Sequence, residues 1–113
     1  AFRSCSSLTT VTIPTSVISI GSEVFRDCRN LVTVNFNATN CTSIDSDTWV
    51  NCPNFTTLNL GNGVTRIPSK GFQGATGLES VNIPNAVTNI GDYAFDGCTS
   101  LATVGFGNAI VLV

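Results

Sequence analysis

Residues 1–21 read AFRSCSSLTTVTIPTSVISIG, and the same order of aromatic, small, aliphatic and turn-forming residues recurs along the chain. The recurrence is anchored on aromatic residues at intervals of 23, 24, 23 and 23 positions. These anchors are Phe2, Phe25, Trp49, Phe72 and Phe95. A fixed period of this length indicates a repeat protein, because one unit buries its apolar face only when neighbouring units stack on it.

The remaining apolar residues keep this spacing once a single extra residue is allowed between Phe36 and Cys41. A small residue stands three positions after each aromatic anchor: Cys5, Cys28, Cys52, Ala75 and Cys98. A large apolar residue stands three positions after that: Leu8, Leu31, Phe55, Leu78 and Leu101. Next come Val11, Val34, Leu58, Val81 and Val104, followed by Ile13, Phe36, Leu60, Ile83 and Phe106. The last two slots alternate with period two, which predicts one short strand per repeat with one buried face.

Turn-forming residues end each predicted strand, namely Pro14, Asn37, Gly61, Pro84 and Gly107. A second apolar pair follows with a spacing of three, which suits a turning backbone: Val17, Cys41, Val64, Val87 and Ile110, then Ile20, Ile44, Ile67, Ile90 and Val113. After a further turn the sequence A-F-x-x-C begins again. We predict that it forms one turn of 3₁₀- or α-helix with its aromatic and cysteine inward, because positions three apart share a face.

The strand pattern L-x-x-V-x-I resembles a leucine-rich repeat. The fuller pattern A-F-x-x-C-x-S-L-x-x-V-x-I-P-x-x-V-x-x-I-G, seen in residues 1–21, 78–91 and 94–101, is similar to the BspA-type branch. The resemblance covers the whole chain and implies a right-handed, curved solenoid, mostly strand and coil with little helix. We divide it into about five repeats, at about 1–23, 24–47, 48–70, 71–93 and 94–113. Departures at Asp45, Trp49, Phe55, Pro68 and Ala75 keep size or turn chemistry, so we expect them to preserve the fold.

The composition disfavours several classes of partner and activity. Only 11% of the 113 residues are charged, where about 25% is usual, and the net charge is −2. A chain with so few charges and a net negative charge offers no basic patch to bind nucleic acid or an anionic membrane. No apolar run is long enough to span a bilayer. Histidine is absent, no nucleophile is paired with a base, and the acidic residues do not align into a calcium ladder. We therefore expect no enzyme activity, no cofactor and no metal.

Polar rows flank the buried strand positions and form a candidate ligand face, which we expect on the concave side. Its members are Thr10, Thr12, Thr33, Asn35, Thr57, Asn59, Ser80, Asn82 and Thr103. One hypothesis is that the rows stabilise the sheet through cross-strand hydrogen bonds. A second is that they bind a broad protein or glycan partner, although they contain no aromatic or arginine hot spot. A third is ice binding, which a hydroxyl row favours and the asparagines disfavour.

Four of the five cysteines share one slot, so stacked repeats could place them at disulfide distance, with Cys5–Cys28 and Cys28–Cys52 as the candidate pairs. Ala75 fills the same slot, which favours buried free thiols instead. Zinc is disfavoured because no two cysteines are close in sequence. Asn37, Asn40 and Asn54 are glycosylation acceptors by sequence, relevant only in a eukaryotic secreted protein. For Asn54 a turn role is the favoured hypothesis.

The two ends of the sequence lie at nearly the same point of the coil, and neither carries the polar cap that repeat solenoids need. We expect either a segment of a longer array or head-to-tail stacking of copies, which produces filaments when it does not close. The main expectation is a non-enzymatic interaction or adhesion module. The BspA-type resemblance implies an extracellular or cell-surface location and a protein or glycan partner there. The alternative is a subunit of an extracellular filament.

Overall fold

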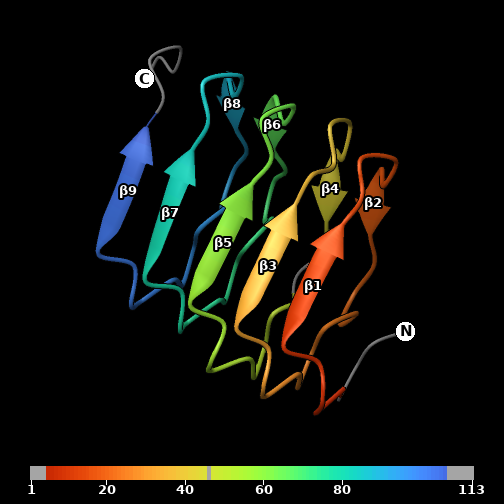
Figure 1. Cartoon of the computed structure of the whole chain (residues 1–113), viewed down its shortest axis with the longest axis vertical. Helices are drawn as coiled ribbons and strands as arrows, with labels where there is room; N and C mark the ends of the chain where they lie inside the picture. Colours follow the sequence, from red (N-terminus) through yellow and green to blue (C-terminus); the bar gives the residue numbers. More distant parts are fainter. Residues whose placement is uncertain (1–4, 46, 107–113) are drawn as a thin grey trace.

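The computed structural model describes residues 5–45 and 47–106, apart from the side chains of Thr103 and Phe106. Over these residues the chain is a parallel β-solenoid without a helix, which confirms the predicted architecture. Figure 1 shows one long strand per coil, side by side from the first coil to the last. Several predicted slot residues lie outside the described part of the chain: Phe2, Gly107, Ile110 and Val113.

The long strands form one five-stranded parallel sheet in the order β1-β3-β5-β7-β9. They are β1 (Thr10–Ile13), β3 (Thr33–Phe36), β5 (Thr57–Leu60), β7 (Ser80–Ile83) and β9 (Thr103–Phe106). The register pairs equivalent positions of successive repeats, such as Val11 with Val34 and Val34 with Leu58. Each predicted strand therefore exists, and alternate side chains point into and out of the coil.

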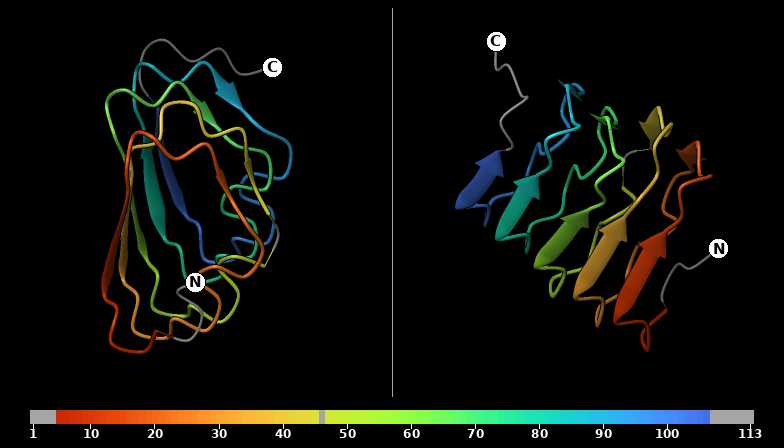
Figure 2. Two further views of the ribbon diagram at one scale, coloured as in Figure 1. Left: turned by 90° about the vertical axis from the view of Figure 1, so that its right-hand side faces the viewer. Right: turned by 45° about the horizontal axis from the view of Figure 1, so that its top comes forward.

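Short strands of two residues each form a second wall, which the sequence analysis expected only as turning backbone. They are β2 (Ser19–Ile20), β4 (Ser43–Ile44), β6 (Arg66–Ile67) and β8 (Asn89–Ile90). Figure 2 shows this wall across the coil from the five-stranded sheet. The short strands pair as β2 with β4 and β6 with β8, so the described wall is two small sheets rather than one.

Pro68 accounts for one of the backbone hydrogen bonds that are missing between β4 and β6. In the neighbouring coils, the residue at the position of Pro68 donates its backbone N–H to the preceding coil and so continues the hydrogen bonding of the short strands. These bonds run from Asp45 N to Ile20 O at 3.0 Å and from Gly91 N to Ile67 O at 2.8 Å. Proline has no N–H, so the corresponding bond to the Ile44 carbonyl cannot form. An isolated bridge between Ser43 and Ser69 joins the two coils instead.

The core consists of the predicted rows, with the aromatic anchors stacked at its centre. Ring centroids lie 5.2 Å apart for Phe25 and Trp49, and 5.8 Å apart for both Trp49 with Phe72 and Phe72 with Phe95. Trp49 is buried and its Nε1–H donates to the Gly71 carbonyl at 2.8 Å, which satisfies its polar atom. The predicted buried anchor is confirmed for Phe25, Trp49 and Phe72, while Phe95 is half-buried.

Ile90 and Val104 are exceptions to the predicted burial, with 36% and 38% of their surfaces exposed. Both belong to the last coils of the described chain. No described coil covers their outer side, whereas Ile44, Ile67, Val34, Leu58 and Val81 lie between two neighbouring coils. Their exposure follows from position along the stack.

The A-F-x-x-C segments form hydrogen-bonded turns, so the prediction of a helical turn is wrong. The expected bond between residues three apart exists, as in Cys28 N to Phe25 O at 3.3 Å and Cys98 N to Phe95 O at 3.1 Å. However, residues two before and two after each anchor adopt positive φ: Glu23, Asp47, Lys70 and Tyr93, then Asp27, Asn51, Gly74 and Gly97. A left-handed residue on either side of the anchor prevents a right-handed helix from forming.

The extra residue of the second repeat is accommodated as an inward bulge. Ala38 is buried at 1% exposure, whereas the residues that follow the strand end in the other coils are not buried. We therefore place the insertion at Ala38, inside the predicted interval. A small apolar side chain fills the space at this point, and the register of the long strands continues undisturbed.

Candidate functional site

The outer face of the five-stranded sheet carries the predicted ligand-face residues. We call it the strand face, and define it by Thr10, Thr12, Thr33, Asn35, Thr57, Asn59, Ser80 and Asn82. The register places them in two continuous rows, one through Thr10, Thr33, Thr57 and Ser80 and one through Thr12, Asn35, Asn59 and Asn82. Thr33 and Asn35 are half-buried and the other six are exposed. Thr103 continues the first row by its backbone, but its side chain lies outside the description.

Side-chain hydrogen bonds link part of the second row across the strands. Asn59 Nδ2 donates to Asn35 Oδ1 at 2.9 Å, and Asn35 Nδ2 donates to Thr12 Oγ1 at 3.4 Å. At the end of the row, a side chain at Gly105 would come within 2.4 Å of Asn82 Oδ1. These contacts favour the hypothesis that the row stabilises the sheet. They leave the exposed hydroxyls of the first row available to a partner.

The five cysteines are free thiols, and the candidate pairs Cys5–Cys28 and Cys28–Cys52 do not form. Cys28, Cys41 and Cys52 are buried, whereas Cys5 and Cys98 are half-buried. Two thiols donate to carbonyls of the preceding coil, Cys52 to Phe25 O at 3.0 Å and Cys98 to Phe72 O at 3.2 Å. The slot therefore uses cysteine as a small apolar residue that also satisfies a backbone acceptor.

Burial makes these thiols poor nucleophiles. It raises the pKa of Cys52 to about 11, against an ordinary value of 9.0, with smaller upward contributions from Cys28 and Asp27. Burial also raises the pKa of Cys41 and of Cys98. Because the thiolate is the reactive form, the arrangement does not support cysteine catalysis.

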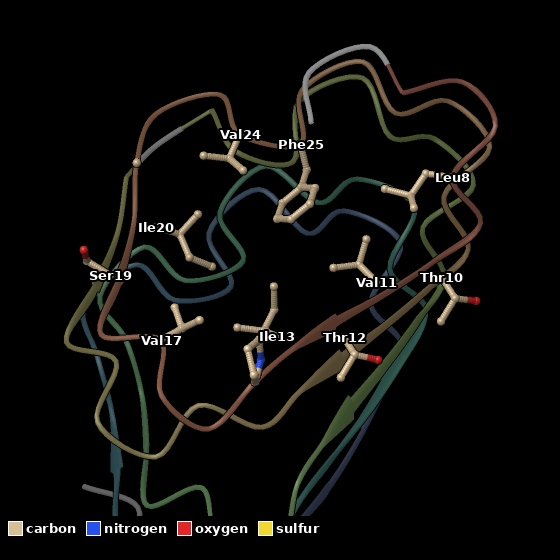
Figure 3. Close-up of a pocket in the computed structure, with 12 residues that line it drawn as sticks. Leu8, Thr10, Val11, Thr12, Ile13, Val17, Ser19, Ile20, Val24 and Phe25 are labelled. Carbon is tan, nitrogen blue, oxygen red and sulfur yellow. The ribbon is translucent and has the colours of Figure 1, made fainter. Parts of the chain in front are cut away.

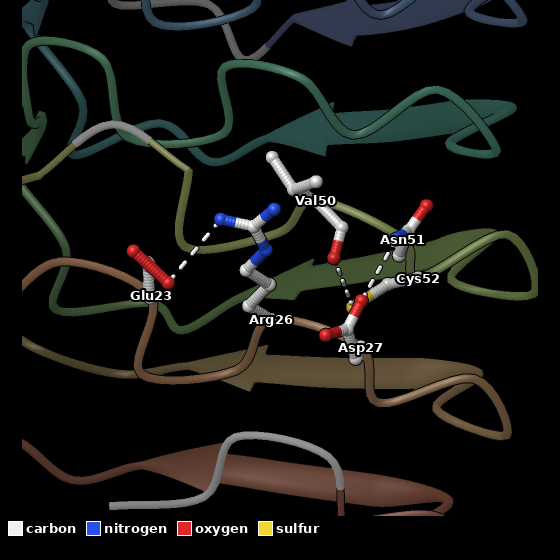
Figure 4. A network of polar contacts seen from close by, with 6 residues as sticks. All are labelled: Glu23, Arg26, Asp27, Val50, Asn51 and Cys52. Carbon is white, nitrogen blue, oxygen red and sulfur yellow. Dashed lines mark hydrogen bonds and ion pairs between the residues drawn. The ribbon is translucent and has the colours of Figure 1, made fainter.

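The turns beside the cysteines carry a small polar network, shown in Figure 4. Arg26 Nη1 lies 3.2 Å from Glu23 Oε2, and Asn51 Nδ2 donates to Asp27 Oδ1 at 2.8 Å. Asp27 and Asn51 both have positive φ, and their side-chain bond joins two coils. The network cross-links turns and presents no group of acids and bases converging on one point.

The three glycosylation acceptors differ in accessibility. Asn54 Nδ2, the atom that a glycan would modify, donates to the Arg29 carbonyl at 2.8 Å, which supports the structural role favoured for this slot. Asn30 makes the equivalent bond to the Ser6 carbonyl one coil earlier. Asn37 is half-buried, whereas Asn40 is exposed on the turn that follows the Ala38 bulge.

An apolar hollow of about 530 Å³ opens at the first described coil. Figure 3 shows Leu8, Val11, Ile13, Ile20 and Phe25 directed into it, while Thr10 and Thr12 point away. The inward residues occupy slots that are core positions in the other coils. We therefore assign this hollow to the packing interior rather than to a ligand site.

A second, polar hollow of about 340 Å³ lies where β4 and β6 fail to pair. It is lined by Thr39, Asn40, Thr42, Thr65, Arg66, Thr88 and Asn89. This site was not among those predicted from the sequence. A signal was present, because Thr42, Thr65 and Thr88 share one slot of the repeat and Arg66 follows Thr65 directly.

Among residues 5–45 and 47–106, no three His, Cys, Asp or Glu side chains are grouped so that they could hold a metal ion. The same residues include no helix long and apolar enough to cross a membrane.

One strand per 23- or 24-residue coil, paired in parallel over rows of aliphatic and aromatic side chains, defines a leucine-rich-repeat solenoid. The model of the BspA type leucine rich repeat region matches residues 1–112 in six copies. The chain therefore belongs to the BspA-type leucine-rich repeat family. No curated protein matches its sequence significantly.

Three solved structures of bacterial origin are similar to this chain. A leucine-rich repeat protein from Bacteroides ovatus is 22% identical, with 91% of this chain and 32% of that chain covered and a TM-score of 0.65. A leucine-rich cell surface protein from Faecalibacterium prausnitzii is 24% identical, over 88% and 32% of the two chains, with a TM-score of 0.50. The T. pallidum leucine-rich repeat protein is 21% identical, over 90% and 60%, with a TM-score of 0.52. At these identities the likeness shows the fold, and this chain spans about a third of the first two proteins.

Proposed function

We propose that this chain is a non-enzymatic binding module of a cell-surface or secreted protein, and that its strand face contacts a protein partner. The observation that carries the proposal is the exposed hydroxyl row of Thr10, Thr57 and Ser80 along a continuous five-stranded sheet. Such a surface is uncharged and held in register by the backbone. It offers many hydrogen-bond donors and acceptors without the long charged side chains that lose entropy on binding.

Membership of the BspA-type family supports the proposed location and class of function. One structural neighbour is described as a cell surface protein, and the chain described here would be one segment of a comparable array. The buried, unreactive thiols and the structural networks of the turns give no support to a catalytic role. The strand face is a continuous exposed surface that remains for a partner.

Binding of the purified chain to a panel of immobilised extracellular-matrix proteins, measured by surface plasmon resonance, tests the proposal. Thr57→Lys places a long cation in the middle of the strand face. We expect it to weaken binding at least tenfold, because the new charge must be desolvated at the interface without a partner. Asn62→Lys adds the same charge on the exposed turn after β5 and should leave binding unchanged.

Both variants should retain the thermal unfolding midpoint of the parent chain, because both sites are exposed. Equal loss of binding in the two variants would show that general charge controls the interaction. Retained binding in Thr57→Lys would place the contact on another surface.

A further inference from the structure

The polar hollow of about 340 Å³ lies away from the strand face, at the junction of the β2-β4 and β6-β8 sheets. Two local features of the sequence lie next to this junction. Pro68 removes the N–H that would tie β6 to β4, and the Ala38 bulge adds a residue to the turn before β4. The second and third coils are therefore not joined by paired strands here, although they are paired along the five-stranded sheet.

Arg66 is the charged residue of the hollow. Its exposed side chain makes no ion pair with any described residue, in contrast to Arg26, which pairs with Glu23 at 3.2 Å. No Asp or Glu lines the hollow, so its guanidinium has no internal counter-charge there. A planar guanidinium in this setting matches a carboxylate, which it can bind through two parallel hydrogen bonds.

The rest of the lining consists of threonine hydroxyls and asparagine amides. One of them is engaged weakly, since Thr65 Oγ1 lies 3.5 Å from the Thr39 carbonyl. For Thr42, Thr88 and Asn89 the described structure contains no side-chain hydrogen bond. No aromatic or large aliphatic side chain lines the hollow, so it lacks the apolar anchor that a peptide partner uses.

From this arrangement we propose that the hollow binds an acidic sugar unit of a glycan. Arg66 takes the sugar carboxylate, and the hydroxyls and amides of Thr65, Thr88 and Asn89 exchange hydrogen bonds with the ring hydroxyls. The assignment follows from one unpaired cation among neutral groups that both donate and accept, which are the groups that a uronic acid presents in return. An acidic peptide shares the carboxylate but not the surrounding hydroxyls.

Titration of the ¹⁵N-labelled chain with trigalacturonate, followed by NMR, tests the site directly. We expect saturable shifts of the backbone amides of residues 65, 66, 88 and 89 at millimolar ligand. Galactotriose, which has the hydroxyls without the carboxylates, should bind at least tenfold more weakly. The tripeptide Glu-Glu-Glu, which has the carboxylates without the hydroxyls, should do the same.

Two variants separate the site from general electrostatics. Arg66→Gln should weaken trigalacturonate binding at least tenfold, while Arg29→Gln removes the same charge from an exposed position outside the hollow and should change it less than twofold. Absence of shifts at these amides, equal effects of the two variants, or equal binding of the tripeptide overturns the proposal. Thr57→Lys on the strand face should leave trigalacturonate binding intact, so this site and the proposed protein-binding function can fail separately.

Discussion

Gly74 and Gly21 look interchangeable in the sequence but differ in backbone conformation. Neither would bring a new side chain within 4 Å of another atom if it were replaced by alanine. Gly74 has a φ of +80°, whereas Gly21 is not in the left-handed region. Comparing alanine substitutions at the two positions therefore measures the free energy cost of the left-handed backbone without a contribution from steric crowding.

We expect Gly74→Ala to lower the free energy of unfolding by about 1 to 2 kcal/mol, because an L-residue with a Cβ strains in the left-handed region. Gly21→Ala should be neutral or raise it by up to about 1 kcal/mol, because alanine restricts the unfolded chain. Urea unfolding followed by Trp49 fluorescence measures both. Equal destabilisation by the two substitutions would contradict the role assigned to φ.

The buried thiol of Cys52 predicts how stability depends on pH. Its pKa is about 11 in the folded chain and near 9.0 when exposed, so the folded state holds the proton over a range where the unfolded state has lost it. The free energy of unfolding is therefore unaffected by this group below about pH 8. It falls as pH rises from about 9 towards 11, with a slope of at most ~1.4 kcal/mol per pH unit.

Cys52→Ala should flatten this alkaline slope. Urea midpoints at pH 8, 9 and 10 measure the difference. In the native protein at pH 8, Cys52 should also resist modification by a thiol reagent until the chain is unfolded. Rapid native labelling of Cys52 would show that the coil opens locally.

At the scale of the element, Pro84 and Pro68 each remove a backbone hydrogen bond between neighbouring strands. Their effects differ because the strands differ in length. Pro84 occupies the slot in which Asn37 and Gly61 donate their backbone N–H groups to the preceding coil. As a result β5 and β7 pair over three residues and lack the fourth pair that β3 and β5 form. A four-residue strand tolerates this loss. The two-residue strand β6 does not pair with β4, and Pro68 removes one of the N–H donors that such a pairing needs.

Pro68→Ala should therefore join the two short sheets. The new N–H gains the Ile44 carbonyl as acceptor, and Asp45 shows that a residue with a Cβ fits the equivalent position. The gain of about 0.5 to 1.5 kcal/mol is offset by the freer unfolded chain, so the net stability change should be small. Hydrogen exchange is the informative measurement: the amide of residue 68 should be protected, and trigalacturonate affinity should fall as the hollow closes.

Pro84→Ala is the matched control for this substitution. It should extend an existing ladder and protect the amide of residue 84 without changing trigalacturonate affinity, because the long sheet lies away from the lining of the hollow. A fast-exchanging amide at residue 68 in Pro68→Ala would show that the Ala38 bulge alone separates the coils.

At the scale of the whole molecule, each coil is stabilised by its neighbours, and the described aromatic stack runs from Phe25 to Phe95. Trp49 lies at the centre, contacting Phe25, Phe55 and Phe72 with ring centroids 5.2 to 5.8 Å apart. In a linear array, stability is close to a sum of coil and interface contributions. A substitution that removes the Trp49 ring therefore removes packing free energy from the interfaces with both neighbouring coils.

We expect Trp49→Ala to cost about 3 to 5 kcal/mol, the usual range for a large aromatic removed from a core. Trp49→Phe should cost less, since it keeps a ring in the stack and loses mainly the hydrogen bond to the Gly71 carbonyl. Urea unfolding followed by far-ultraviolet circular dichroism measures both changes. A cost for Trp49→Ala below about 1 kcal/mol would show that the coils do not depend on a continuous stack.

The sequence predicted the solenoid, the five long strands, their register and the burial of the anchor row, because each of these follows from the spacing of apolar side chains. It predicted a helical turn at A-F-x-x-C wrongly. Apolar spacing of three does not distinguish a helix from successive turns, and the left-handed positions hold residues such as Lys70 and Tyr93 that give no warning of positive φ. The strand-face residues are brought together as predicted, and whether they bind a partner stays a prediction.

The sequence by itself determined the family and the stacking of coils, since a period of 23 residues repeated five times leaves little freedom in how apolar slots align. Only the tertiary structure decided where this regularity fails. Pro68 lacks the N–H that would bond to a carbonyl of the preceding coil, and Arg66 lies in a polar hollow lined by residues of three successive coils. Both depend on contacts between residues more than 20 positions apart, which local spacing does not reveal.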